Sequence, residues 1–217
     1  MYKRQEEFDE YVRDLVDVRQ RAHLPPVAPF LLESADHPTV AVRLDALDAI
    51  TSIANRGMPG GAAKIIAMVE RDPDTSVRRA ACSLGGKLGD AMLVPMYATQ
   101  TASLDDPQQY AACMEGLVAM FHNHPVFDTA SEPAYRLFLE RLQTSPRSEQ
   151  SPPWSVMSTF CYFSHDADLE KLAAWKQRAT WFDANEVKRV ITGVINDKAT
   201  SWEARTAAVE SLVGLGA

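Results

Sequence analysis

The sequence predicts an all-α protein, an α-α superhelix in which pairs of helices stack in a row. Two observations lead to this prediction. A segment recurs with a period close to 35 residues, and the apolar residues within it follow helical spacing. No bounded run of alternating β-branched residues competes with the helical pattern, so no strand is expected.

The repeat is clearest in the segments 36–46 and 72–81. A small residue stands three positions after the arginine of each segment, Ala46 in the first and Ala81 in the second. A third Asp-Pro step, at Pro107, lies 34 residues beyond the second copy of the motif. The matching residues that lie 35 positions apart are Pro38 and Pro73, Val42 and Val77, and Arg43 and Arg78.

Local signals define the helices of one unit. Asp72 and Pro73 are expected to cap and start the second helix, because aspartate accepts free amide hydrogens and proline needs no donor in the first turn. Gly85 and Gly89 are expected to end this helix, and the Met-Pro-Gly-Gly turn at 58–61 precedes the first helix of the unit. The apolar stripe of the second helix contains Val77, Ala81, Leu84 and Leu88.

The stretch 72–95 resembles a HEAT repeat. The resemblance is strongest over 37–95, weaker over 96–200, and returns at 202–209, where Arg205 and Ala208 keep the same spacing. It implies a HEAT-like solenoid of about five to six helix pairs. In such repeats an aspartate of the inter-helix turn and an arginine of the second helix form a ladder along the stack. The ladder residues that the resemblance implies here are Asp36, Arg43, Asp72, Arg78 and Arg205.

The whole chain, 1–217, is expected to form one HEAT-like domain. An amphipathic N-terminal helix at 1–23 is expected to cap it, and the polar stretch 144–153 is expected to be a long inter-helix loop. The helix pairs predicted between them are 24–35 with 39–56, 60–71 with 75–89, 91–102 with 108–123, 132–144 with 153–164, and 168–181 with 184–196, followed by a last helix near 201–214.

The charge balance restricts the partners to be expected. The formal net charge is −7 and the pI about 5.2, so the excess of Lys and Arg that phosphate contacts demand is missing and nucleic acid is an unlikely partner. A basic protein would instead be attracted. No run of 18 apolar residues predicts a membrane span, the N-terminus lacks a secretory signal, and we expect a monomer.

The three cysteines, Cys82, Cys113 and Cys161, are separated by 31 and 48 residues and form no metal or redox motif. Each lies in an apolar helical stretch, where a free cysteine acts as a small buried hydrophobe. Free thiols fit a reducing, cytoplasmic setting.

No catalytic motif is present, so no catalytic residue, cofactor or metal site is expected. The pair His122 and His124 would need two further ligands to hold zinc, and a histidine at a helix end usually serves the exposed carbonyls.

A polar strip on the second helices is the best candidate for a contact surface, because extended concave surfaces are what helical repeat proteins use. The expected partner-binding residues are Asp45, Asp48, Ser52, Asn55, Arg79, Ser83, Lys87, Glu115 and His122. All four tryptophans lie in the C-terminal half, where they pack in the core or, if exposed, anchor a partner. They are Trp154, Trp175, Trp181 and Trp202.

These observations favour a non-catalytic protein-binding solenoid, an inhibitor, immunity protein or adaptor that captures a basic partner on its concave face. The alternative is a DNA-binding or DNA-repair enzyme, because HEAT-like stacks also occur in alkylpurine DNA glycosylases. A third possibility is a lyase of the bilin-attachment kind, which also uses short HEAT-like repeats, although no residue here points to a tetrapyrrole.

Overall fold

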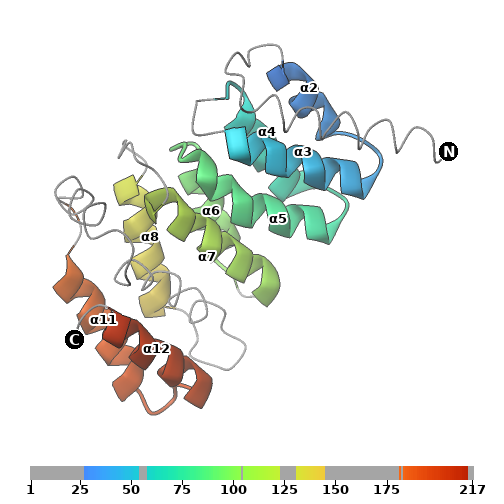
Figure 1. The fold of residues 1–217 in the computed structure, drawn as a ribbon. Coiled ribbons are helices and arrows are strands. Elements are labelled where there is room, and N and C mark those ends of the chain that lie inside the picture. The colour runs from blue at the N-terminus through green and yellow to red at the C-terminus, as the bar shows by residue number, and fades with distance from the viewer. Residues whose placement is uncertain are drawn as a thin grey trace.

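A computed structural model of the chain describes residues 27–53, 58–103, 105–122, 131–144, 181 and 183–214. All regular structure in this part is helical, which confirms the predicted all-α class (Figure 1). The predicted helix at 1–23 and, apart from Thr144, the predicted loop at 144–153 lie outside it. The elements are α2 (Val27–Ser34), α3 (Val40–Ile53), α4 (Gly61–Arg71), α5 (Thr75–Gly85), the 3-10 helix η3 (Gly86–Leu88), α6 (Leu93–Gln100), α7 (Pro107–His122), α8 (Ser131–Thr144), α11 (Ala184–Asn196) and α12 (Trp202–Gly214).

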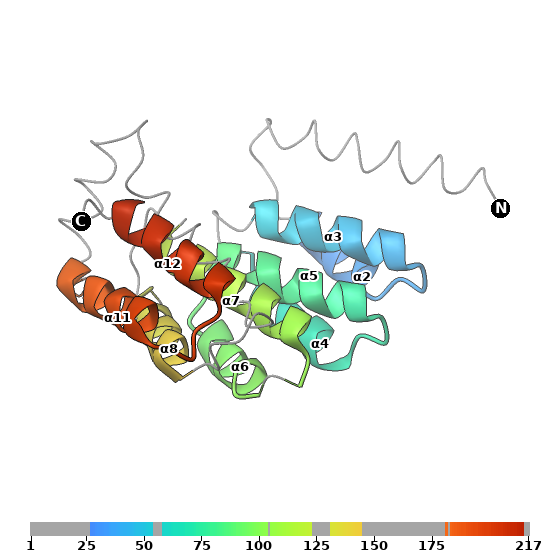
Figure 2. The ribbon, with the colours of Figure 1, turned by 90° about the horizontal axis from the view of Figure 1, so that it is seen from below.

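The helices lie in two rows. The second helices α3, α5 and α7 contact one another in sequence, and the first helices α4, α6 and α8 do the same in the other row. Figure 2 shows the row of second helices, with α12 beyond α7, on the inner side of a shallow bend. The helix at 168–181 that the sequence pairs with 184–196 lies outside the described residues apart from Trp181. Within the described residues, α11 packs against α12.

The helix ends follow the local signals with one correction. The cap of α5 is Asp74, whose side chain accepts hydrogen bonds from the amides of Ser76 and Val77. The carboxylate of Asp72, the predicted cap, instead forms an ion pair with Arg43, which is described below. Gly89 ends the 3-10 segment with a φ of 61°, a left-handed conformation that costs a glycine nothing.

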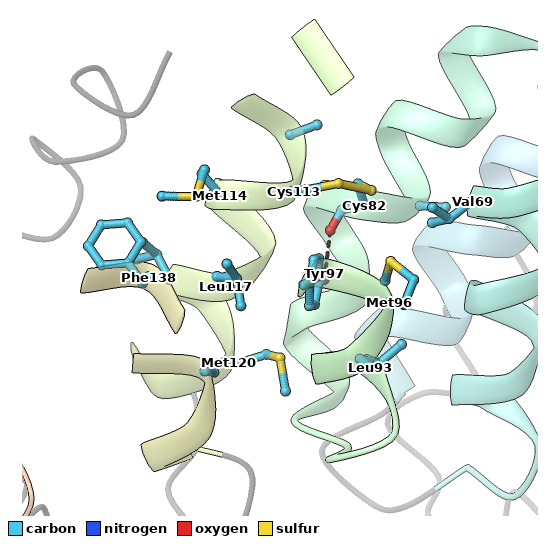
Figure 3. Packing of buried hydrophobic residues seen from close by; sticks show 14 of the residues in the cluster. Val69, Cys82, Leu93, Met96, Tyr97, Cys113, Met114, Leu117, Met120 and Phe138 are labelled. Atoms are coloured by element: carbon cyan, nitrogen blue, oxygen red, sulfur yellow. Dashed lines mark hydrogen bonds between the residues drawn. A yellow bond between two sulfur atoms is a disulfide. The ribbon is translucent and has the colours of Figure 1, made fainter. Parts of the chain in front are cut away.

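The core runs between the rows as one cluster of buried apolar side chains (Figure 3). On α5 the predicted stripe is confirmed at Val77 and Ala81, which are fully buried, whereas Leu84 and Leu88 are only partly buried. Tyr97 of α6 is also fully buried, and its hydroxyl donates to the carbonyl oxygen of Cys82 at 2.8 Å. Burial strongly raises the pKa of this phenol, so Tyr97 stays neutral.

The α5 and α7 backbones meet at glycines. A Cβ atom on Gly86 would lie 1.8 Å from the carbonyl oxygen of Gly116, and a Cβ atom on Gly116 would lie 2.2 Å from the carbonyl oxygen of Cys82. Neither position has room for a larger residue. The absence of side chains therefore sets how closely these two second helices approach.

The cysteine prediction was wrong in one respect. Cys82 and Cys113 are fully buried, as expected, but they are joined by a disulfide between α5 and α7 (Figure 3). Stacking brings the two helices into contact, which places side chains 31 positions apart within bonding distance. The pairing removes the free thiols on which the cytoplasmic expectation rested. Cys161 lies outside the described residues.

Candidate protein-binding face

The candidate residues on α3 lie on one exposed side of that helix. Asp45, Asp48 and Ser52 are exposed. The opposite side, with Ala46 and Ile50, is buried in the core. This division is the one that the helical spacing predicts. Asn55, the fourth candidate on this strip, lies outside the described residues.

The structure brings the candidates of α5 and α7 together. The Ser83 hydroxyl of α5 donates to Glu115 Oε2 of α7 at 2.9 Å, and Glu115 is exposed. Lys87 is half-buried in the 3-10 segment that extends α5, and it too has an interaction partner. His122 is the last residue of α7, and its side chain lies outside the described residues.

We call the solvent-exposed side of the second helices α3, α5 and α7 the second-helix face. Its members on described residues are Asp45, Asp48, Ser52, Ser83, Lys87 and Glu115. The hydrogen bond from Ser83 to Glu115 joins polar residues of α5 and α7 that lie 32 positions apart in the sequence.

Arg79, the remaining candidate, forms an ion pair with an aspartate from the turn before the next second helix. Its Nη2 atom lies 3.2 Å from Asp106 Oδ2, in the turn before α7. Asp106 also caps α7 by accepting from the amides of Gln108 and Gln109. The Gln109 amide, followed by the Arg79 guanidinium, lowers the pKa of Asp106, so this carboxylate stays ionised well into the acid range.

Two of the predicted ladder residues, Arg43 of α3 and Asp72 in the turn before α5, form a buried ion pair, which we call the buried rung. Arg43 Nε and Nη2 donate to Asp72 Oδ2 and Oδ1 at 2.8 and 2.9 Å, and the two side chains are 8% and 5% exposed. Arg43 Nη1 also donates to the carbonyl oxygens of His37 and Pro38. Asp72 Oδ1 also accepts a hydrogen bond from the backbone amide of Asp74. Nearly every donor and acceptor of the pair is therefore satisfied, as burial of a charge requires.

The other ladder residues make different contacts from those implied by the resemblance. Asp36 pairs with Lys64 at 2.6 Å on the surface. Arg78 donates to the backbone carbonyl of Asp72 at 2.7 Å instead of reaching a carboxylate. Arg205 donates to the backbone carbonyl of Asp197 at 2.9 Å.

The C-terminal aromatic residues divide between core and surface. Trp181 packs against Tyr135, with ring centroids 5.0 Å apart, and burial together with the Glu186 charge raises the pKa of Tyr135 to about 12. Trp202, at the start of α12, is 77% exposed. Trp154 and Trp175 lie outside the described residues.

Sequence reasoning missed two features that hold or extend this surface. The Arg79 rung was missed because the arginine next to the motif position, and not the motif arginine itself, reaches forward. Exposed Val209 and Val213 on α12 had no signal that distinguished them from core residues.

The described residues contain no group of three or more His, Cys, Asp or Glu side chains placed to hold a metal ion. Among the described helices none is long and apolar enough to cross a membrane. Comparison with known proteins adds no identity, because neither a protein-family model nor a curated protein matches this chain.

Proposed function

We propose that this protein is a HEAT-like helical repeat protein that binds a basic partner protein through its second-helix face. The observation that carries the proposal is the set of surface polar side chains on three stacked helices. Ser83 and Glu115 join across α5 and α7, and the exposed acids of α3 lie in the same row. Extended surfaces of this kind are how stacked helical repeats bind other proteins.

The buried rung supports the repeat assignment. Arg43 of one unit forms an ion pair with Asp72 of the next. One unit further along, Arg79, which directly follows the motif arginine Arg78, forms an ion pair with Asp106. A rung that recurs between consecutive units is the property expected of a ladder in a solenoid. The solenoid would extend over the whole chain as a single domain.

Charge supports the class of partner. The chain carries a net charge of −7, and the exposed side chains of the second-helix face include Asp45, Asp48 and Glu115. Complementary charge accelerates capture of a basic protein and suppresses acidic competitors. An inhibitor or immunity protein that neutralises a basic target, or an adaptor, would use this surface in the same way.

The test uses capture by variants of the intact chain. Immobilised wild-type protein is exposed to lysate of the source organism, and retained proteins are quantified by mass spectrometry. Glu115→Lys reverses one charge on the second-helix face, while Glu70→Lys makes the same change at an exposed position of α4 in the other row.

We expect a basic protein to be retained by the wild type and by Glu70→Lys, and to be reduced at least about tenfold on Glu115→Lys, because a rim of complementary charge controls association. Equal retention by the two variants would contradict the proposed face. Retention of acidic proteins alone would contradict the proposed partner class.

A further inference from the structure

α12 carries a stripe of large apolar side chains on its exposed side. Trp202, Val209 and Val213 are 77%, 46% and 63% exposed, and exposed Thr206 lies between the first two. Intervals of four, three and four residues place all four on one side of the helix. Ala208, on another side of α12, is fully buried.

Two of the four positions, those of Val209 and Val213, are buried in α3 and α5. Arg43, Arg78 and Arg205 each donate to a backbone carbonyl of the turn before their own helix, which aligns α3, α5 and α12. Four residues after these arginines stand Leu47, Cys82 and Val209, and eight residues after them stand Thr51, Gly86 and Val213.

In α5 these positions contact the next second helix. Cys82 is bonded to Cys113 of α7, and Gly86 lies against the backbone of Gly116. In α3 the equivalent residues are also buried, and α3 contacts α5. In α12, by contrast, the equivalent residues Val209 and Val213 are exposed. We call Trp202, Thr206, Val209 and Val213 the α12 stacking surface.

We propose that the α12 stacking surface binds an amphipathic basic helix of the partner protein. This inference rests on the proposed function and names the element that the partner contributes. A helix is the fitting occupant because on α5 the positions equivalent to Val209 and Val213 contact the next second helix, α7. The apolar stripe of such a helix would pack on Trp202, a residue type that dominates binding hot spots.

The acidic border of the surface selects a basic helix. Glu210 is exposed and directly follows Val209, which places it beside the stripe. Lysines or arginines flanking the apolar stripe of an incoming helix would meet this border. A second copy of the chain fits less well, because antiparallel packing of two α12 helices would gather the glutamates of both on one border, and both chains carry −7.

The test measures binding of a synthetic peptide to the full chain by fluorescence anisotropy. The probe is a helix of roughly 18 residues, or five turns, with leucines at intervals of three and four residues and lysines beside them. A matched peptide carries glutamate in place of each lysine. Met92→Ala is the control variant, since Met92 is 58% exposed but lies before α6.

We expect the lysine peptide to bind saturably and the glutamate peptide to bind at least about tenfold more weakly. Trp202→Ala and Glu210→Lys should each weaken binding of the lysine peptide by at least about tenfold, whereas Met92→Ala should leave it unchanged. All of these positions are exposed, and unchanged circular dichroism spectra would confirm that the variants fold.

The inference is overturned if the lysine peptide does not bind, if both peptides bind equally, or if Trp202→Ala binds as well as the wild type. A dimer in sedimentation equilibrium that Trp202→Ala abolishes would assign the surface to a second copy instead. Failure here is separable from failure of the proposed function. If Trp202→Ala captures the partner fully while Glu115→Lys does not, the second-helix face stands and the α12 surface is excluded.

Discussion

The buried rung between Arg43 and Asp72 allows a quantitative test of the stacking. In the Arg43→Met variant, the Asp72 carboxylate, which is 5% exposed, loses its cation and two charge-assisted hydrogen bonds. Removing one partner of a buried pair costs about 3–5 kcal/mol, because the remaining charge has no compensation. That cost is a large part of the roughly 5–15 kcal/mol by which a folded protein is stable.

The assay is urea unfolding followed by far-ultraviolet circular dichroism, in which the midpoint should fall while the slope stays constant. Arg136→Met is the matched control, because Arg136 is 49% exposed and pairs with Glu186, so its loss should cost less than about 1 kcal/mol. In the double variant Arg43→Met with Asp72→Leu, part of the cost should return, because no buried charge is left. An Arg43→Met cost no larger than that of the control would refute the assignment of this pair as a buried rung.

Three further predictions concern the α5–α7 contact and the cap of α7. Gly116→Ala should destabilise the protein by about 1–3 kcal/mol through overpacking. Gly193→Ala, where a Cβ atom meets nothing within 4 Å, should stabilise it by about 0.5–1 kcal/mol. Thermal unfolding measures the midpoint temperatures of both variants against that of the wild type. Replacing Cys82 and Cys113 by alanine should cost about 3–4 kcal/mol for a loop of this length, and dithiothreitol should then no longer shift the urea midpoint. Folding lowers the pKa of Asp106, so its charge stabilises the fold above the unfolded value of about 3.9 and ceases to do so as the pH falls through the lower folded-state value. Asp106→Asn should therefore lower the urea midpoint near neutral pH, and this effect should shrink as the pH is lowered below about 3.9.

The helices could be predicted from the sequence because their signals are local. The bounds of α11 agree with the predicted 184–196, since Asp183 caps the helix and the apolar residues keep helical spacing. The exposed strip on α3 followed in the same way from the positions of Asp45, Asp48 and Ser52.

The contacts between units could not be predicted with the same success. Asp72 has the sequence context of a helix cap, and only its distance from Arg43, 29 residues earlier, shows that it belongs to an ion pair. The disulfide did leave a signal: one repeat of 35 after Cys82 is Leu117, and Cys113 precedes it by one helical turn. Spacing alone cannot show whether the turn of α7 that contains Cys113 faces α5. That depends on the angle at which α5 and α7 cross, which is set by the glycines at their contact.

The glycine contact between α5 and α7 also has a mechanical consequence. At this joint the two backbones touch at Gly86 and Gly116, a covalent bond crosses nearby, and the Tyr97 hydroxyl tethers α6 to α5. Sliding or tilting of one helix over the other would drive backbone atoms into each other. We therefore expect the contact between α5 and α7 to resist bending, so that a change of curvature would have to occur at other contacts between helices.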